Sequence, residues 1–265
     1  MDESENPPQG FIFYKGASQI NGKPIVGIAV GLKNKSKNEK TGGMIQTYIL
    51  ADGFKPTQAL VEGQDAAVCG NCIHRKADGG IGSCYVNVSQ GPSSVYKAYK
   101  RGNYTVLPQQ AVRSLLSDRI VRMGTYGDPT AIPLPIWENA LSKTAGWTGY
   151  THQWRRAIAR GFEQYCMAST ETVEQTELAR KRGWRTYRIR TGADDKILKG
   201  EFECPASKEA GNRLTCETCL ACDGGNPKKV SPTIIVHGIS AKVKHLRDTV
   251  ERMKKKRKYR GMYAK

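Results

Sequence analysis

Three cysteines in a glycine-rich segment are the residues whose types and spacing best suit chemistry. Cys69 and Cys72 form a C-x2-C pair, and Cys84 follows after eleven further residues. A C-x2-C pair places two thiolates on one tight turn, which suits a tetrahedral metal ion or an iron–sulfur cluster. Three protein ligands leave one coordination position open, where chemistry can occur. The spacing also allows a closed structural zinc site with His74 or Cys166 as the fourth ligand, or free thiols.

A second group of cysteines lies toward the C-terminal end of the chain, with the spacing C-x11-C-x2-C-x2-C. Four thiolates saturate a metal, so this group predicts a supporting site rather than a catalytic one. The spacing leaves structural zinc and an iron–sulfur cluster both open. Cys166 stands alone in an apolar segment and is predicted to be a buried thiol. The second group consists of Cys204, Cys216, Cys219 and Cys222.

The composition limits the classes of protein to consider. The 265 residues suffice for one large domain or two small ones. No run approaches the roughly 20 apolar residues of a membrane span. The segment Met1–Gly10 is acidic and lacks the apolar stretch of a signal peptide, so we expect a cytoplasmic protein without membrane contact. In that compartment eight cysteines favour metal binding over disulfides.

The formal net charge of +18 indicates an anionic partner, most often nucleic acid. The segment Lys242–Lys265 contributes half of it, with eleven basic and two acidic residues. Apolar residues recur there at helical spacing, which predicts a helix over 242–258 that docks by one face and binds phosphate with the other. The alternative is a basic solubilising tail. The apolar residues are Val243, Leu246, Val250 and Met253, and the basic candidates are Lys244, Arg247, Lys254, Lys255 and Arg257.

The order of predicted elements indicates an α/β protein. Strand-like segments around Asn21-Gly22, a hairpin signal, predict an antiparallel start to the chain. After Arg119, strands alternate with helices, which predicts βαβ units and a parallel sheet; Phe162–Ala168 is one such strand, and Thr172–Arg182 is a helix capped by Ser169 or Thr170. The predicted parts are an N-terminal β extension (1–60), an α/β core (61–240) with a Cys-rich insertion (204–225), and a basic C-terminal helix and tail (241–265).

Polar residues follow the predicted strands at their carboxyl ends, where parallel sheets collect functional groups. The first such loop holds the three cysteines, and the next three are Thr125–Pro129, Thr151–Trp154 and Ser169–Glu171. Each of these motifs is weak alone, because a Gly-Asp-Pro tripeptide is usually a turn and a Thr-His pair is usually a core feature. Their shared placement predicts that they project to one rim.

With these motifs the chain resembles the radical S-adenosylmethionine (SAM) superfamily over roughly Val68–Gly238. The three-cysteine loop follows an early strand, Tyr126-Gly127-Asp128-Pro129 is similar to the family's Gly-Gly-Glu-Pro motif, and Met167–Thr170 resembles its fourth strand. The chain also resembles phage-encoded radical-SAM-like proteins of unknown function, in which a tyrosine follows the last cluster cysteine as Tyr85 does here. The family's usual cysteine spacing is x3 then x2, and its motif has glutamate where this chain has aspartate.

The resemblance implies a partial (β/α) barrel, similar to a TIM barrel, with an N-terminal antiparallel β extension and a C-terminal Cys-rich loop. It implies that Cys69, Cys72 and Cys84 hold a 4Fe–4S cluster whose open iron chelates SAM, and that Gly127 and Asp128 contact the methionine end of SAM. The second cysteine group would then hold an auxiliary cluster, with zinc as the alternative. The cofactor-binding candidates on the rim are Gly127, Asp128, His152 and Ser169.

Aromatic and basic residues are interleaved in two segments, Trp147–Arg160 and Trp184–Arg190. Aromatic stacking beside arginine is how proteins hold single-stranded nucleic acid. In the second segment, strand alternation places Thr186, Arg188 and Arg190 on one face, which predicts a basic face inside the barrel. The alternative is that the aromatics are core and the arginines lie on a solvated face. The nucleic-acid-binding candidates are Arg155, Arg156, Arg188 and Arg190.

These observations predict an iron–sulfur, radical-SAM-like enzyme that acts on a nucleic acid or nucleotide. The alternative is a zinc-stabilised nucleic-acid-binding protein without catalysis. The sequence singles out no catalytic residue, and it leaves the substrate, the reaction and the oligomeric state open.

Overall fold

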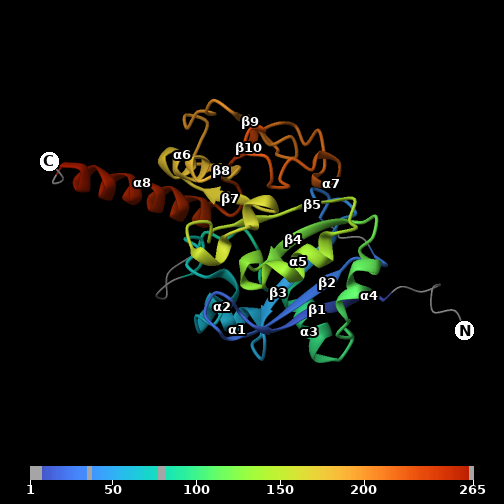
Figure 1. The fold of residues 1–265 in the computed structure, drawn as a ribbon. Helices are drawn as coiled ribbons and strands as arrows, with labels where there is room; N and C mark the ends of the chain where they lie inside the picture. Colours follow the sequence, from blue (N-terminus) through green and yellow to red (C-terminus); the bar gives the residue numbers. More distant parts are fainter. Residues whose placement is uncertain (1–7, 35–37, 77–81, 263–265) are drawn as a thin grey trace, which may run out of the picture.

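The computed structural model describes residues 8–34, 38–76 and 82–262, with the side chains of the last helix described as far as Lys255. Within these residues the chain forms a mixed α/β fold with two five-stranded sheets, one mixed and one parallel, and no closed barrel (Figure 1). The expected α/β class is therefore confirmed.

The first sheet joins an antiparallel start to parallel strands. Its first three strands pair antiparallel in chain order. The fourth strand pairs parallel to the third, and the fifth pairs parallel to the fourth. This arrangement confirms the predicted antiparallel extension, whose alternating and apolar runs suit half-buried and buried strands. In sheet order the strands are β1 (Gly10–Ala17), β2 (Pro24–Val30), β3 (Ile45–Ala51), β4 (Ile120–Tyr126) and β5 (Gly146–Thr148).

The second sheet is parallel throughout. It begins one residue after β5, because only Gly149 separates the last strand of the first sheet from the first strand of the second. A Cβ atom on Gly149 would lie 2.7 Å from the Cys166 sulfur, so this junction requires glycine. In sheet order the strands are β6 (Tyr150–Thr151), β7 (Met167–Thr170), β8 (Thr186–Arg190), β10 (Ser231–Ile235) and β9 (Glu201–Glu203).

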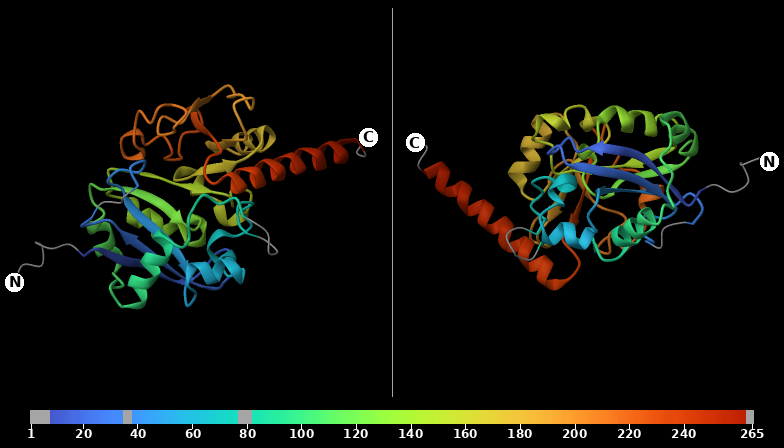
Figure 2. Two further views of the ribbon diagram at one scale, coloured as in Figure 1. Left: turned by 180° about the vertical axis from the view of Figure 1, so that it is seen from behind. Right: turned by 90° about the horizontal axis from the view of Figure 1, so that it is seen from below.

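Short helices connect the strands, and one long helix ends the described chain. This last helix leaves the body of the molecule and extends away from it in every view (Figures 1 and 2). Short 3-10 turns cover 129–131, 157–159 and 162–164. The α-helices are α1 (Pro56–Val61), α2 (Ala66–Cys69), α3 (Gly91–Lys100), α4 (Gln109–Leu115), α5 (Leu134–Leu141), α6 (Val173–Lys181), α7 (Cys216–Cys219) and α8 (Ser240–Met262).

Two apolar clusters hold the fold together. The larger one gathers side chains of β1 to β4 with α5, and Phe13 packs on Trp137 with ring centroids 5.0 Å apart. The smaller one places Met44 and Ile234 against the second cysteine group. Burial of these apolar side chains is the main favourable term in folding. The second cysteine loop is therefore part of the core rather than an appendage.

Most predicted elements are confirmed within a residue or two, and one is corrected. The predicted strand Phe162–Ala168 begins only at Met167, because Phe162–Gln164 forms a 3-10 turn after Gly161 in the left-handed region. The cap of α6 is Thr172, whose side chain accepts a hydrogen bond from the Gln175 amide, and neither Ser169 nor Thr170. Four short elements, α1, α2, β9 and α7, were not predicted.

Candidate metal centre at the carboxyl ends of the strands

Loops from the carboxyl ends of four strands meet at one place. The cysteine loop lies between β3 and β4, Asp128 follows β4, His152 follows β6, and Glu171 follows β7. Hydrogen bonds join them: the Asp128 amide donates to the Val68 carbonyl at 2.6 Å, and the Gln153 side chain donates to the Cys69 carbonyl at 3.1 Å. Parallel strands present their carboxyl ends at one edge, so the predicted common rim is observed in this arrangement.

The cysteine loop is held by a glycine and an arginine. Gly70 ends α2 with φ +59°, and a Cβ there would lie 2.6 Å from the Gln153 amide group, so only glycine lets the two loops approach. Arg75 pairs with both carboxylate oxygens of Asp65, at 2.9 and 2.6 Å, and also donates to the Gly70 carbonyl at 2.8 Å. A bidentate pair of this kind fixes direction as well as distance. The turn after Cys69 is therefore fixed without a metal.

The three thiols of this loop are neighbours. Cys69, Cys72 and Cys84 are all half-buried. Burial raises the pKa of Cys69 well above its ordinary value, and the nearby Cys72 and Cys84 raise it further. Burial also raises the pKa of Cys84, with a contribution from Cys72. Neighbouring thiolates repel one another, so a bound cation would be needed to keep all three ionised.

The spacing of the sulfurs is wider than a single zinc ion requires. Among the described residues, no three cysteine sulfurs all lie within 4.8 Å of one another. Zinc–sulfur bonds of about 2.3 Å in a tetrahedron would bring the sulfurs to about 3.8 Å. An iron–sulfur cluster binds each thiolate through a different iron, so it spans a wider set. The described cysteines therefore form no closely packed metal site, and the choice between a cluster and zinc stays a prediction.

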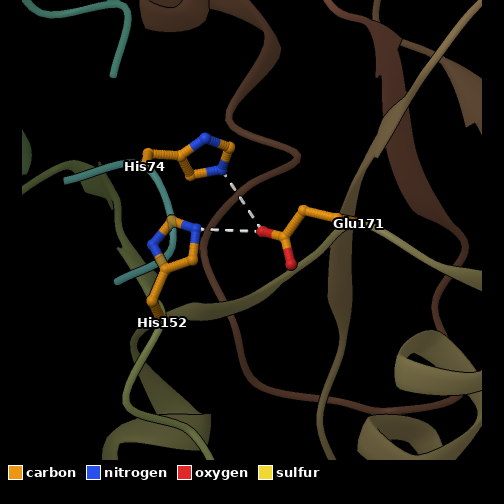
Figure 3. A group of neighbouring side chains, drawn as sticks. All are labelled: His74, His152 and Glu171. Atoms are coloured by element: carbon orange, nitrogen blue, oxygen red, sulfur yellow. Dashed lines mark hydrogen bonds and ion pairs between the residues drawn. The ribbon is translucent and has the colours of Figure 1, made fainter. Parts of the chain in front are cut away.

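A histidine–histidine–glutamate group lies beside the cysteine loop (Figure 3). His152 Nε2 is 3.1 Å from Glu171 Oε1, and His74 Nε2 is 3.3 Å from the same oxygen. Their three ligand atoms lie within 4.8 Å of one another. The other ring nitrogen of His74 is 2.8 Å from the Ser83 hydroxyl, which fixes the orientation of the ring. Two imidazoles and one carboxylate in this arrangement can hold a zinc or iron ion.

The charges of this group are uneven. Burial alone would raise the pKa of Glu171, but hydrogen bonds from His152 and His74 outweigh it and lower the pKa to about 2. Burial alone would lower the pKa of His152, but Cys72 and Glu171 raise it well above its ordinary value. Burial lowers the pKa of His74. These shifts favour a charged His152, an ionised Glu171 and a neutral His74.

His152 connects the two groups of ligands. Cys72 is near enough to raise the pKa of His152, and the His152 Nε2 lies 3.1 Å from Glu171 Oε1. The rings of His74 and His152 meet edge to face, with centroids 5.0 Å apart. Thiols, imidazoles and carboxylate thus form one continuous site at the rim of the sheet.

Asp128 fixes the backbone and threonine side chains of this rim through hydrogen bonds to its carboxylate. Its buried carboxylate accepts hydrogen bonds from Thr130 (amide at 3.1 Å and hydroxyl at 2.8 Å), from the Thr151 hydroxyl at 2.8 Å and from the His152 amide at 2.9 Å. Both carboxylate oxygens are thereby occupied. These bonds hold the backbone of His152, and the expected contact of Asp128 with SAM stays a prediction.

The other two cofactor-binding candidates have different surroundings. Gly127 has φ +87°, and a Cβ there would lie 2.7 Å from the Cβ of Ile49, so this position needs glycine for packing. Ser169 is buried within β7, and its carbonyl accepts a hydrogen bond from the Trp154 indole at 3.0 Å. Of the four rim candidates, only His152 presents a ligand atom to the group of Figure 3.

The second cysteine group lies at the opposite ends of the strands. The Gly149 amide before β6 donates to the Cys222 carbonyl at 3.0 Å, and Arg185 before β8 donates to the Gly224 carbonyl at 2.8 Å. The carboxylate of Glu217 accepts from the Gly43 amide at 2.6 Å, close to the start of β3. This loop therefore packs against residues at the amino-terminal ends of these strands.

Tyrosine hydroxyls surround this second group. Tyr150 lies near enough to Cys222 to lower its pKa, and Cys204 raises the pKa of Tyr187. Burial raises the pKa of Cys222, and the nearby Cys204, Cys216 and Cys219 raise it further. That each cysteine group forms its own metal site stays a prediction.

Two predicted nucleic-acid contacts are corrected. The predicted face of β8 exists, but acids cover it: Arg188 is fully buried and pairs with Glu201 at 2.8 Å and with Asp195 at 2.6 Å. Arg190 pairs with Glu203. A buried charge is stable only when paired, so these arginines neutralise local acids and are not open to phosphate.

The other arginines and the last helix are more exposed. The Arg155 guanidinium stacks on Trp154 at 4.1 Å from the ring centroid, whereas Arg156 donates to the Ile20 carbonyl at 3.1 Å. Trp184 is a core residue and Trp147 packs against the core, as the alternative interpretation held, whereas Tyr150 is outside this cluster; Trp154 is also in the core. The apolar stripe of α8 docks through the buried Leu246 and Val250. Lys244, Arg247, Lys254 and Lys255 are exposed as predicted, and the side chain of Arg257 lies outside the described residues.

Sequence reasoning did not assign Glu171 a role, and considered His74 only as a zinc ligand. The available signal was position: Glu171 is the first residue after β7, at the same edge as His152. Its pairing with two histidines depends on the path of the cysteine loop, which spacing does not specify.

Comparison of the chain with protein-family models, with curated proteins and with solved structures finds no match. Among the described helices, none is long and apolar enough to cross a membrane.

Proposed function

We propose that the protein is an iron–sulfur, radical-SAM-like enzyme that acts on a nucleic acid or nucleotide. One observation carries this proposal: three neighbouring thiols occupy the carboxyl edge of parallel strands, beside His152 and Glu171. Three thiols leave one metal position unfilled by the chain, and the carboxyl edge is where α/β enzymes place their reacting groups.

The sheet supports a partial barrel. From β3 through β10 the strands are parallel, and the break between the two sheets is the single residue Gly149. A parallel series of this kind, with a bend in the middle, is what a partial (β/α) barrel would show. The antiparallel strands β1 and β2 close one side of it.

Cys69, Cys72 and Cys84 would hold the cluster, because they are near enough for Cys72 and Cys84 to raise the pKa of Cys69. When bound, such a cluster with SAM would supply one-electron chemistry. The chain's own groups would supply the proton. His152 holds one at neutral pH, shares it with Glu171, and lies beside Cys72. His74 is neutral and can accept one.

The nucleic-acid part of the proposal depends on charge. The exposed basic side chains of α8 lie on a helix that leaves the body, where a phosphate backbone can reach them (Figure 2). Lys242 ties the start of this helix to the metal site, because its ammonium group donates to the Cys84 carbonyl at 2.6 Å. Phosphate contacts give affinity without sequence information, so any specificity would come from the rim.

The test is anaerobic purification of the wild-type chain, with iron, sulfide, zinc and visible absorbance measured together. The proposal predicts a brown protein with iron and sulfide, and loss of most of the signal from one of two sites in Cys84→Ser. Cys166→Ser is the matched control, because Cys166 is a buried thiol in the core cluster. A colourless protein that contains only zinc would contradict the proposal and support the zinc-stabilised binding protein.

A second candidate is favoured by the group in Figure 3. His74, His152 and Glu171 would hold one zinc or iron(II) ion, which would make the protein a mononuclear metal enzyme. In that case His74→Ala would remove one metal equivalent, whereas Cys84→Ser would leave that metal in place. The cluster proposal predicts the reverse, namely loss of metal in Cys84→Ser and unchanged metal in His74→Ala.

A further inference from the structure

Arg122 occupies the space between the two cysteine groups. It lies on β4, half-buried, and its terminal nitrogen donates to the Tyr85 hydroxyl at 2.8 Å. Its guanidinium carbon is 5.7 Å from the centroid of the Tyr150 ring. Tyr85 directly follows Cys84 of the first group, and Tyr150 lies near Cys222 of the second, whose pKa it lowers. The arginine is thus bordered by two phenols, one from each site.

Arg122 has no acidic partner among the described residues, unlike several arginines around these sites. Arg75 pairs with Asp65, Arg185 with Asp223, and the arginines of β8 with three further acids. Within the part of the chain that the structure describes, Arg122 forms no ion pair with a carboxylate. A half-buried cation without a counter-ion is unfavourable, because it has lost part of its water and gained no anion.

The surroundings keep the guanidinium charged and reachable. Burial alone would lower the pKa of Arg122, but Tyr85, Tyr150 and Cys216 outweigh burial and raise it. The Tyr85 side chain is 64% exposed, so the arginine can be approached from solvent past this phenol. A guanidinium fork presents several donors in a plane that matches the oxygens of phosphate.

We propose that Arg122, with Tyr85 and Tyr150, forms a subsite for a phosphate group of the substrate. The inference rests on the proposed function, since the phosphate would belong to a nucleic acid or nucleotide. Arg122 would pair with the phosphate, the Tyr85 hydroxyl would donate a second hydrogen bond, and the exposed Tyr85 ring would offer a stacking face for the adjoining base. Because Tyr85 is next to Cys84, a phosphate held here places the nucleotide beside the first metal site.

Cys216 offers the competing explanation. Its thiolate would be a negative charge near Arg122, and the arginine lowers the pKa of Cys216 against the effect of burial. Arg122 could then be only the counter-ion of the second metal site. The hydrogen bond of Arg122 goes to Tyr85, which lies beside Cys84 of the first group, and this favours the phosphate subsite. If Arg122 binds phosphate, removing its charge should weaken nucleic-acid binding. If Arg122 is only a counter-ion, removing its charge should reduce the metal content instead.

The experiment measures binding of a fluorescent eight-nucleotide thymidine oligonucleotide to the full-length protein as purified anaerobically. The variants are Arg122→Gln, Tyr85→Phe and, as matched control, Arg119→Gln, which removes an exposed charge just before the same strand. We expect Arg122→Gln to weaken binding about tenfold and to reduce the salt slope by about one, because one phosphate contact is lost. Tyr85→Phe should weaken binding about threefold, as for one hydrogen bond of about 0.6 kcal/mol, and Arg119→Gln should bind as the wild type does.

Competition identifies the source of the phosphate. If the subsite binds phosphate, thymidine monophosphate should displace the oligonucleotide more weakly from Arg122→Gln than from the wild type. Thymidine, which lacks the phosphate, should displace it equally from both proteins. Inorganic phosphate should give the same result as thymidine monophosphate. Unchanged oligonucleotide affinity in both Arg122→Gln and Tyr85→Phe would overturn it. So would loss of metal from Arg122→Gln at unchanged affinity. Iron content is measured on the same samples, so absence of iron would refute the proposed function without affecting the phosphate result.

Discussion

Replacing Asp128 with asparagine tests whether this residue builds the site or only lines it. The carboxylate accepts from the backbone amides of Thr130 and His152, one through each oxygen, and both threonine hydroxyls add to them. An asparagine amide has only one oxygen, so its NH2 group must face one of these backbone donors. One N–H then loses its acceptor in a buried place.

The cost follows from that loss. A hydrogen bond to a charged acceptor contributes about 1.5–3 kcal/mol, and an unsatisfied buried donor costs about 1–3 kcal/mol. We expect Asp128→Asn to lower the free energy of unfolding by about 3 kcal/mol. Because the His152 amide is one of the two donors, the rim should loosen and bind metal less tightly.

Urea unfolding followed by circular dichroism measures the change, with Asp118→Asn as control. Asp118 is exposed and has φ +57°, a conformation that asparagine tolerates, so its replacement should change stability by less than about 0.5 kcal/mol. If Asp128→Asn were as stable as Asp118→Asn, and kept its metal, the carboxylate would not be organising the rim.

Four further changes have definite expected outcomes. Cys219→Ser should lower both the melting temperature and the metal content, because metal binding at a closed site stabilises the fold, and no change in either would refute this. Glu201→Gln should cost about 3 kcal/mol in urea unfolding, since it leaves Arg188 buried beside one acid instead of two; a cost below about 1 kcal/mol would contradict it. Binding to a single strand should depend on salt with a log–log slope of roughly −3.5 if five phosphates are contacted. Truncation after Ile239 should flatten this slope by several units, whereas removing the six C-terminal residues should change the slope little. The raised pKa of His152 contributes stability that is fully present below a pH of about 6.5 and is lost as the pH rises through the folded-state pKa. The metal-free protein should therefore become less stable at alkaline pH, and His152→Gln should remove this pH dependence.

Local patterns predicted the long elements well. The apolar runs of β1 to β3 and the alternation after Arg119 gave both the antiparallel start and the parallel sheet, because period and turn signals are local properties. The short elements α1, α2, α7 and β9 were not predicted, since each is too short to show a clear hydrophobic period. β9, for example, exists only by pairing with β10.

The site was predicted in position more than in detail. Strand ends placed Asp128, His152 and the cysteines at one edge, as observed. The roles of individual carboxylates depend on partners that spacing does not specify. Asp128 is occupied by backbone amides, and Glu171 pairs with two histidines from different loops. Likewise, the alternation of β8 was read correctly, but the acids that cover Arg188 come from a later segment.

Electron paramagnetic resonance of the anaerobically reconstituted and reduced protein, recorded with and without SAM, tests the central claim most directly. A cluster held by Cys69, Cys72 and Cys84 has one iron without a protein thiolate, so adding SAM should change its spectrum. The same change should be absent from Cys84→Ser and present in Cys166→Ser. A reduced protein with no cluster signal, or with a signal that SAM leaves unchanged in the wild type, would contradict the account.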